Sequence, residues 1–396
     1  MSEEALSGIR VLDLTHHIAG PYCTKLLADS GAEVIKVERP GHGDAARRSG
    51  PFPGDQPHLE KSGTFSYLNT NKLGVTLNLK SRRGRAILRE LVPQVDVLVE
   101  NFEPRIMADW GLTYPSLREL NAKLVMTSIS NFGQTGPYRD YQATEIVFCA
   151  LGGLMYITGA HDREPLKMGL SQVQYLAGSY GALATMIALR GTGTTGIGQH
   201  VDLSIMECLQ ASLLSQTSYY SLMGAVLRRN ARAGGVFSEI LPCEDGHVVL
   251  VEGAEWERVT EFLGIPELKN PAFSTLAGRT MHAPDLRKIM SAYLMNKGKQ
   301  EVFHSAQEWR FSAGMAQTAE DLVACPQLNA RGYFVQIEDS QIGRIRLPGP
   351  AFKMTGTPSN LMRTAPSLGQ DNAEIYGKSL GFSEAQLGKL MAQKVL

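Results

Sequence analysis

The sequence predicts an α/β fold built on a Rossmann-like, doubly wound parallel sheet. Residues 9–14 (IRVLDL) have the pattern of an apolar strand, a helix of about ten residues follows, and residues 34–37 (VIKV) form a second strand. A strand–helix–strand unit pairs its strands in parallel through a right-handed crossover. The same alternation continues at 95–100 and 124–129. Ligands of such sheets bind at the carboxyl ends of the strands.

Turns and caps support this order of elements. Pro21 suits the first turn of the first helix, and Ser30-Gly31 ends it. Ser81 can cap a helix that extends to Val92. The other elements predicted in this part are helices at 144–156, 175–189 and 207–223, a polar, glycine-rich turn at 192–198 and a strand at 200–205.

The chain changes character after a basic, glycine-containing stretch at 228–235, which is typical of a linker. Beyond it, the turn Glu244-Asp245-Gly246 separates strands at 236–241 and 247–252, and helical patterns occupy 254–263, 283–295 and 299–308. A second hairpin at 334–338 and 344–347 and a helix at 383–393 follow. A chain of 396 residues is too long for one ordinary core. We therefore expect a large Rossmann-like domain that begins with 1–225, a small α+β domain at 226–317, and a return to the large domain at 318–396.

The composition excludes several classes of function. Lys+Arg and Asp+Glu both number 39, so no positive charge favours nucleic acid. No apolar run approaches the ~18 residues of a membrane span, and MSEEALSG lacks the apolar core of a signal peptide. The five cysteines are scattered without a CxxC pair, which predicts a reducing, cytoplasmic environment and no metal site.

Charged residues near strand ends are the first candidates for a ligand site. Neither GxGxxG nor GxxxxGK[ST] is present, so a nucleotide-like ligand needs other contacts, and Arg39 and Lys80 could bind its phosphates. His16 and His17 are candidates for acid–base chemistry or ligand contact, with packing and solvation as the alternative. Glu145 is either a buried functional carboxylate or an acid at a helix start, and the pattern favours the second interpretation.

Motifs along nearly the whole chain point to one family. They are the N-terminal block LSGIRVLDLTHHIAGPYCTKLLADSGAEVIKVERPGHGD, then LNLKSRRGRAILRELV, DVLVENFEP, SISNFGQTGPY, GGLMYITG, TGIGQHVDLSIME and APSLGQDNAEIY. In this order and spacing they resemble the class III CoA-transferase family, which includes formyl-CoA transferase and carnitine CoA-transferase. The resemblance implies a large domain built from both chain ends, a small domain between them, and two chains interlocked as linked rings.

The resemblance also implies covalent chemistry on an aspartate. In the family its carboxylate attacks an acyl-CoA thioester to form a mixed anhydride, CoA returns to form an enzyme thioester, and an acceptor acid then takes the CoA. That aspartate stands five residues after the glycine matching Gly169, where this chain has Gln174, and an amide cannot form the anhydride. An arginine that helps to hold CoA precedes the glycine matching Gly111. Asp109 stands at or next to its place and would repel phosphates.

Other positions match the pocket of the family. Glu145 matches an acidic residue near its active site, and the glycine-rich flap of the family is reduced here to Ala233-Gly234-Gly235. The resemblance implies that CoA, as a substrate, is held by His16, Ala19, Arg39, Leu77, Leu79, Lys80, Asn101 and Phe102.

These features lead us to expect a non-catalytic subunit of a heteromeric CoA-transferase, whose homologous partner chain supplies the aspartate. The chain resembles such a subunit of the two-subunit succinyl-CoA:benzylsuccinate CoA-transferase, so succinyl-CoA and benzylsuccinate are the implied substrates. Two alternatives stay open. One is an active enzyme that uses another carboxylate, such as Glu145, and the other is a CoA-binding regulatory homodimer without turnover.

Overall fold

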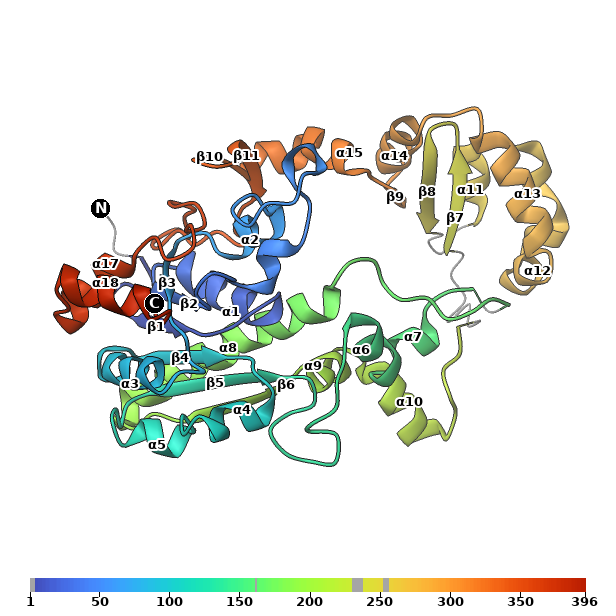
Figure 1. The fold of residues 1–396 in the computed structure, drawn as a ribbon. Helices are drawn as coiled ribbons and strands as arrows, with labels where there is room; N and C mark the ends of the chain where they lie inside the picture. The colour runs from blue at the N-terminus through green and yellow to red at the C-terminus, as the bar shows by residue number, and fades with distance from the viewer. Residues whose placement is uncertain (1–3, 161, 230–237, 252–255) are drawn as a thin grey trace. The chain divides into compact units, whose positions relative to one another are not determined.

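The structure is a computed structural model that describes residues 4–160, 162–229, 238–251 and 256–396. The chain forms two compact units, one of Met1–Arg229 with Gly332–Leu396 and the other of Asn230–Arg331 (Figure 1). Both chain ends therefore belong to the larger unit. The domain boundaries at 225/226 and 317/318 stay a prediction.

The larger unit is organised around a six-stranded parallel sheet with the order β3-β2-β1-β4-β5-β6. The chain winds from β1 through β2 to β3 on one side and from β4 through β5 to β6 on the other. The strand order thus reverses between β1 and β4, where Leu12 lies beside Leu98. This sheet confirms the predicted α/β, doubly wound fold. Its strands are β1 (Arg10–Asp13), β2 (Glu33–Glu38), β3 (Lys72–Thr76), β4 (Val97–Glu100), β5 (Val125–Ser130) and β6 (His200–Ser204).

Helices cover both faces of this sheet (Figure 1). Successive strand residues point to opposite faces, so Val11 packs on the side of α1 and α8, whereas Leu12 packs on the side of α3. The predicted hairpin near the C-terminus is confirmed as antiparallel β10 (Phe334–Asp339) and β11 (Gly343–Pro348). The helices of this unit are α1 (Ala19–Ala28), α2 (Gly63–Leu68), α3 (Arg82–Leu91), α4 (Pro104–Asp109), α5 (Tyr114–Arg118), α6 (Glu145–Leu151), α7 (Leu154–Ile157), α8 (Gln172–Thr195), α9 (Ile205–Ser212), α10 (Leu214–Met223), α17 (Asn372–Glu374) and α18 (Glu384–Ala392).

The smaller unit is an α+β arrangement with its own core. Its antiparallel sheet has the order β7-β8-β9, and Leu241 and Val248 of the sheet are fully buried in one core with the helical residue Leu286. The elements are β7 (Ser238–Cys243), β8 (Gly246–Val251), β9 (Ser312–Met315), α11 (Trp256–Leu263), α12 (Leu276–Met281), α13 (Ala283–Leu294), α14 (Lys299–Glu308), α15 (Ala319–Ala324) and α16 (Pro326–Ala330).

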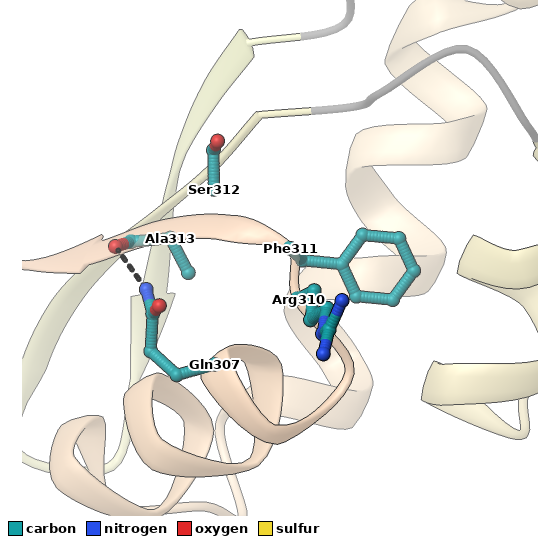
Figure 2. A pocket seen from close by; sticks show the side chains of 5 residues that line it. All are labelled: Gln307, Arg310, Phe311, Ser312 and Ala313. Carbon is teal, nitrogen blue, oxygen red and sulfur yellow. Dashed lines mark hydrogen bonds between the residues drawn. The ribbon is translucent and has the colours of Figure 1, made fainter.

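A hollow of about 520 Å³ lies at the turn between α14 and β9 (Figure 2). Gln307, Arg310 and Phe311 line it, and the Gln307 side chain donates a hydrogen bond of 3.3 Å to the carbonyl of Ala313. The hollow is formed by this one reverse turn, and none of the predicted site residues lines it.

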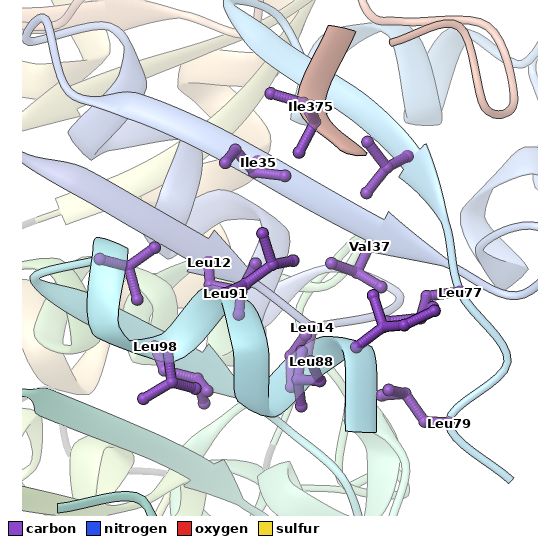
Figure 3. Close-up of a cluster of buried hydrophobic side chains, with 14 of the residues drawn as sticks. Leu12, Leu14, Ile35, Val37, Leu77, Leu79, Leu88, Leu91, Leu98 and Ile375 are labelled. Atoms are coloured by element: carbon purple, nitrogen blue, oxygen red, sulfur yellow. The ribbon is translucent and has the colours of Figure 1, made fainter. Parts of the chain in front are cut away.

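The main apolar core lies on the α3 side of the large sheet (Figure 3). Leu12, Ile35 and Leu88 are fully buried there, and Ile375 from the C-terminal segment joins them. Removing one such side chain typically costs about 2–5 kcal/mol. Leu77, which follows β3, also belongs to this core and brings it to the carboxyl edge of the sheet.

Charged side chains of β1, β2 and β3 are buried in ion pairs. Lys72 Nζ lies 3.0 Å from Asp13 Oδ2, Lys36 Nζ lies 2.9 Å from Asp44 Oδ2, and all four side chains are inaccessible to solvent. Burial would raise the pKa of Asp13, but the charges of Lys72 and Lys36 hold it well below the ordinary value. The strand β3 begins at this buried Lys72, which is why its sequence, KLGVT, has no apolar start and no strand was predicted there.

Three other predictions of secondary structure were wrong in their boundaries. The helix predicted at 144–156 is divided into α6 and α7, because Gly153 between them adopts φ of 83°. The helix predicted at 207–223 is likewise divided into α9 and α10 at Leu213. The turn predicted at 192–198 begins later, because α8 continues to Thr195. The hydroxyl groups of Thr192 and Thr195 donate to carbonyls one helical turn earlier.

Candidate functional site

The loops that follow β1 and β4 meet where the strand order reverses. The amide N–H of His16 donates to Asn101 Oδ1, and Asn101 Nδ2 donates to the carbonyl of His16, both at 2.8 Å. This reciprocal pair joins the carboxyl ends of the two central strands. In open α/β sheets, this is the crevice that binds ligands.

A pocket of about 390 Å³ at this crevice, here called the basic pocket, collects most of the predicted CoA contacts. Its lining carries the exposed cations Arg39, Arg48 and Lys80. The carboxylate of Glu38 also lines it, but this group is paired at 2.7 Å with the buried guanidinium of Arg47. The pocket is therefore positively charged. The predicted contacts that line it are His16, Arg39, Leu77, Leu79, Lys80, Asn101 and Phe102.

Buried polar and aromatic groups hold the inner wall of the basic pocket. Asp44 Oδ1 accepts the amide N–H of His17 at 2.9 Å, and the ring of His16 meets that of Phe102 edge-on at 5.5 Å. Burial lowers the pKa of His16, although the carboxylate of Asp44 opposes this. His16 is thus favoured in its neutral form, which can still donate one hydrogen bond to a ligand.

A second pocket of about 300 Å³, here called the acidic pocket, adjoins the first and shares His17, Asn101 and Phe102 with it. Its lining includes one guanidinium, that of Arg139, together with the residues Glu103, Asp140 and Glu145. Asp140 is paired with Arg105 at 2.6 Å and with Arg139 at 3.3 Å, so Glu103 and Glu145 supply the excess of negative charge. The two pockets therefore differ in charge. The basic pocket would attract phosphate groups more strongly than the acidic pocket.

Gln174 and Glu145 both line the acidic pocket, as does Ala19, the eighth predicted CoA contact. Gln174 lies in the first turn of α8, where it is half-buried. A close approach of α8 to α1 sets this position, because a Cβ atom at Gly178 would lie 2.6 Å from the carbonyl oxygen of Ala19.

Glu145 begins α6 and is buried. Its Oε1 accepts the amide N–H of Val173 at 2.9 Å, which ties α6 to the first turn of α8. Its Oε2 exposes less than 1 Å² and has no hydrogen-bond partner among the described residues. Glu145 is thus an acid at a helix start, as the favoured interpretation predicts, and it is also buried, while a functional role stays a prediction. Its carboxylate is not free to attack a ligand, because one oxygen accepts a hydrogen bond and the other is covered.

Glu100 lies directly behind the wall shared by the two pockets. It is the last residue of β4, it is 2% exposed, and its Oε2 accepts the amide N–H of Phe102 at 2.8 Å. Burial raises the pKa of Glu100 to about 7, although the hydroxyl of Ser128 and the amide of Phe102 both lower it. This carboxyl group therefore supports the loop that carries Asn101 and Phe102.

Some predicted residues lie elsewhere, and some lining residues were not predicted. Asp109 is exposed at the end of α4 and does not line the basic pocket, whereas its neighbour Trp110 does. The segment Ala233-Gly234-Gly235 lies outside the described residues. Arg48 and Arg139 were missed, since nothing in the sequence distinguishes them from other surface arginines.

The described residues contain no group of three or more His, Cys, Asp and Glu side chains that could hold a metal ion. In the same residues, no helix is both long enough and apolar enough to cross a bilayer.

Comparison with known proteins assigns the chain to a family. The model of CoA-transferase family III matches residues 6–372. The succinyl-CoA--D-citramalate CoA-transferase of Chloroflexus aurantiacus is 36% identical, over 99% of this chain and 98% of its own length. The alpha and beta subunits of a succinyl-CoA--L-malate CoA-transferase from that organism are 31% and 30% identical, over 99% of this chain and 92% and 98% of their own lengths. A solved structure of a CAIB/BAIF family protein from Brucella suis matches with a TM-score of 0.87 and 28% identity, over 95% of this chain and 100% of its own. The chain belongs to CoA-transferase family III.

Proposed function

We propose that this chain is the non-catalytic subunit of a heteromeric class III CoA-transferase. The observation that carries the proposal is the amide of Gln174 in the acidic pocket, at the position where the family resemblance implies the nucleophilic aspartate. A homologous partner chain supplies that aspartate. Together they transfer CoA between an acyl-CoA and a carboxylic acid.

The chemistry of the nucleophile explains why this one residue is decisive. A carboxylate oxygen attacks the thioester carbonyl, the C–S bond breaks, and a mixed anhydride remains while CoA leaves as the thiolate. The nitrogen of a carboxamide is delocalised into its carbonyl, and its oxygen carries no negative charge. Gln174 therefore cannot form the anhydride or the enzyme thioester that follows.

Glu145 is a poor substitute nucleophile. One of its oxygens is occupied by the amide N–H of Val173, and the other is covered. An acyl carbon could reach it only after α6 or α8 moves, and displacements of about 1 Å can already cost about a hundredfold in rate. The accessibility of Glu145 thus argues against an active enzyme that uses this carboxylate.

The charges of the two pockets support a defined orientation of CoA. Arg39 and Lys80 in the basic pocket would bind the phosphates, and Leu77, Leu79 and Phe102 offer apolar contacts beside them. The pantetheine arm would then lead past Asn101 toward the acidic pocket, where Ala19 and Gln174 lie. In this orientation the thioester of an acyl-CoA would lie next to the side-chain amide of Gln174.

Unpartnered apolar side chains on α8 support the association with another chain. One face of this helix is made of small residues packed against α1, while Leu183, Met186 and Ile187 on another face are 54%, 46% and 63% exposed. Contiguous exposed apolar side chains are typical of interfaces. We propose that a homologous chain covers them in an interlocked dimer. The alpha and beta subunits among the relatives support a heteromer.

The relatives also suggest the substrates. Several are named for transfer from succinyl-CoA to a dicarboxylic acid, so we propose succinyl-CoA as the donor and a dicarboxylic acid, such as benzylsuccinate or malate, as the acceptor. We place the protein in the cytoplasm, where its five free cysteines, four of them buried, stay reduced.

The test is to assay this chain alone, its partner alone, and the complex with succinyl-CoA and a series of dicarboxylic acids. We expect co-purification with an aspartate-bearing homologue, turnover by the complex, and complete loss when the partner's aspartate is replaced by alanine. The matched replacement Gln174→Ala in this chain should leave most of the activity. Hydroxylamine converts an enzyme anhydride or thioester into a hydroxamate on the protein carboxyl group and releases the acyl group or CoA. Mass spectrometry would contradict the proposal if, after incubation with succinyl-CoA and hydroxylamine, it found a hydroxamate on this chain alone, and a hydroxamate on Glu145 would establish the active-enzyme alternative. CoA binding by a stable homodimer that never takes a partner would favour the regulatory alternative.

A further inference from the structure

Arg48 is a cation of the basic pocket that the family resemblance does not assign to CoA. It is the last residue of the 3-10 turn η1 (Ala45–Arg48), directly after Arg47. The two neighbouring arginines have opposite surroundings. Arg47 is buried between the carboxylates of Glu38 and Glu60, at 2.7 Å from each, whereas Arg48 is exposed and lines the pocket.

The turn that carries Arg48 is held rigidly against the crevice. Asp44 caps it by accepting the amide N–H of Ala46 at 2.9 Å, and the same carboxylate accepts the amide of His17 and pairs with buried Lys36. The hydroxyl of Ser62 donates to the carbonyl of Ala46 at 2.8 Å. The backbone of Arg48 is therefore positioned in advance, which lowers the entropic cost of binding a ligand there.

The guanidinium of Arg48 is also oriented but not neutralised. Its Nη1 donates to the carbonyl of His42 at 2.6 Å, and within the described ranges it forms no ion pair with a carboxylate. A guanidinium has five N–H donors, so most of them stay available. A planar group with free donors matches a phosphate in a bidentate geometry.

The position where the resemblance implies a CoA-binding arginine has no cation. Asp109 stands at or next to it, exposed and outside the pocket lining. CoA carries a pyrophosphate and a 3′-phosphate, so a site that lacks this arginine has to supply positive charge from another element. Of the three exposed cations that line the basic pocket, Arg39 and Lys80 match CoA contacts of the family. Arg48 is the third, and the resemblance assigns it no role.

We propose that Arg48 binds a phosphate group of CoA and replaces, from the turn η1, the cation that α4 lacks at Asp109. This inference rests on the proposed function, because it requires that the chain keeps CoA in the basic pocket. Arg48 is then a binding residue of this subunit and Arg47 a residue that holds the turn.

Titration calorimetry on the full-length chain tests the inference with CoA and 3′-dephospho-CoA as probes. Arg48→Ala should raise the dissociation constant for CoA on the order of tenfold or more, because a charge-assisted hydrogen bond is lost. Arg48→Gln should weaken binding similarly while its amide keeps the contact with the carbonyl of His42. Arg82→Ala, which removes an equal charge from an exposed residue outside the pocket lining, should change the constant less than about twofold.

The two probes identify the phosphate. If Arg48 meets the 3′-phosphate, the preference of the wild-type chain for CoA over 3′-dephospho-CoA should fall toward one in the variants. If it meets the pyrophosphate, both ligands should weaken by the same factor. Dissociation constants that do not change for either ligand in Arg48→Ala and Arg48→Gln, with wild-type binding intact, would overturn the assignment and leave the proposed function standing. Absence of CoA binding by the wild-type chain would overturn the assignment together with the proposed retention of CoA.

Discussion

Replacing Glu100 by glutamine should stabilise the protein at alkaline pH. The carboxyl group is 2% exposed at the end of β4, behind the loop that carries Asn101 and Phe102. Burial raises its pKa from 4.5 to about 7. Glutamine keeps the shape and an acceptor oxygen for the amide of Phe102, but it has no proton to lose. The variant therefore separates the charge of this side chain from its packing.

The size of the effect follows from the pKa difference. A pKa that is about 2.5 higher in the folded than in the unfolded protein corresponds to roughly 3 kcal/mol, at about 1.36 kcal/mol for each pKa unit. The folded protein binds the proton of Glu100 more tightly, so this group's contribution to the free energy of unfolding is fully present below about pH 4.5. It is lost as the pH rises through about 7, and about 2.5 kcal/mol of the loss falls between pH 5 and pH 8.

Urea unfolding of the wild type and the Glu100→Gln variant at pH 5 and pH 8 measures this contribution of Glu100 to the free energy of unfolding. The stability of the variant relative to the wild type should increase by about 1–3 kcal/mol from the lower to the higher pH. Glu103→Gln, a change at an exposed glutamate three residues later, is the matched control and should show no such increase. An equal stability difference at both pH values would refute the argument, because it would mean that burial of Glu100 does not penalise its charge.

Three further substitutions test the candidate site and the buried ion pair of Lys72 with Asp13. Arg39→Ala should weaken CoA binding by about 1–3 kcal/mol, as calorimetry can measure, and an unchanged dissociation constant would show that this arginine does not contact the phosphates. Gln174→Asp should not restore useful turnover to the isolated chain, since a nucleophile misplaced by about 1 Å loses about a hundredfold in rate. Rapid turnover by that variant alone would show that only the nucleophile is missing. Lys72→Met should lower the free energy of unfolding by about 3–5 kcal/mol, because it removes the cation that lies 3.0 Å from the buried carboxylate of Asp13. A loss below about 1 kcal/mol in urea unfolding would contradict this account of the pair.

Local patterns were sufficient for most of the sheet but not for β3. The strands at 9–14 and 34–37 were predicted because most of their residues are apolar and occupy both faces of the strand, as a covered parallel sheet requires. The strand β3 starts with Lys72, whose partner Asp13 is 59 residues away in the chain. A charged residue can begin a buried strand only when such a partner is present. No local sequence pattern predicts that partner.

The candidate site shows the same division. Arg39, Lys80 and Gln174 were identified from residue types and motif spacing, which are properties of the chain itself. Their distribution between two pockets of different charge was not predicted, and Ala19 lines the acidic pocket with Gln174 and not the basic pocket with Arg39 and Lys80. Arg48 could not be found, because the burial of its neighbour Arg47 between two carboxylates is what leaves it facing the crevice.

The sequence by itself determined the α/β class, the family motifs and the absence of a carboxylate at position 174, because each depends on which residues are present and on their spacing. Only the tertiary structure decided which loops share the crevice and which charges lie in each pocket. The strand order brings β1 next to β4, and the Asn101–His16 pair joins their ends across 85 positions of the chain. Contacts over such separations depend on the burial of the whole sheet, so they cannot be deduced from any short stretch of residues.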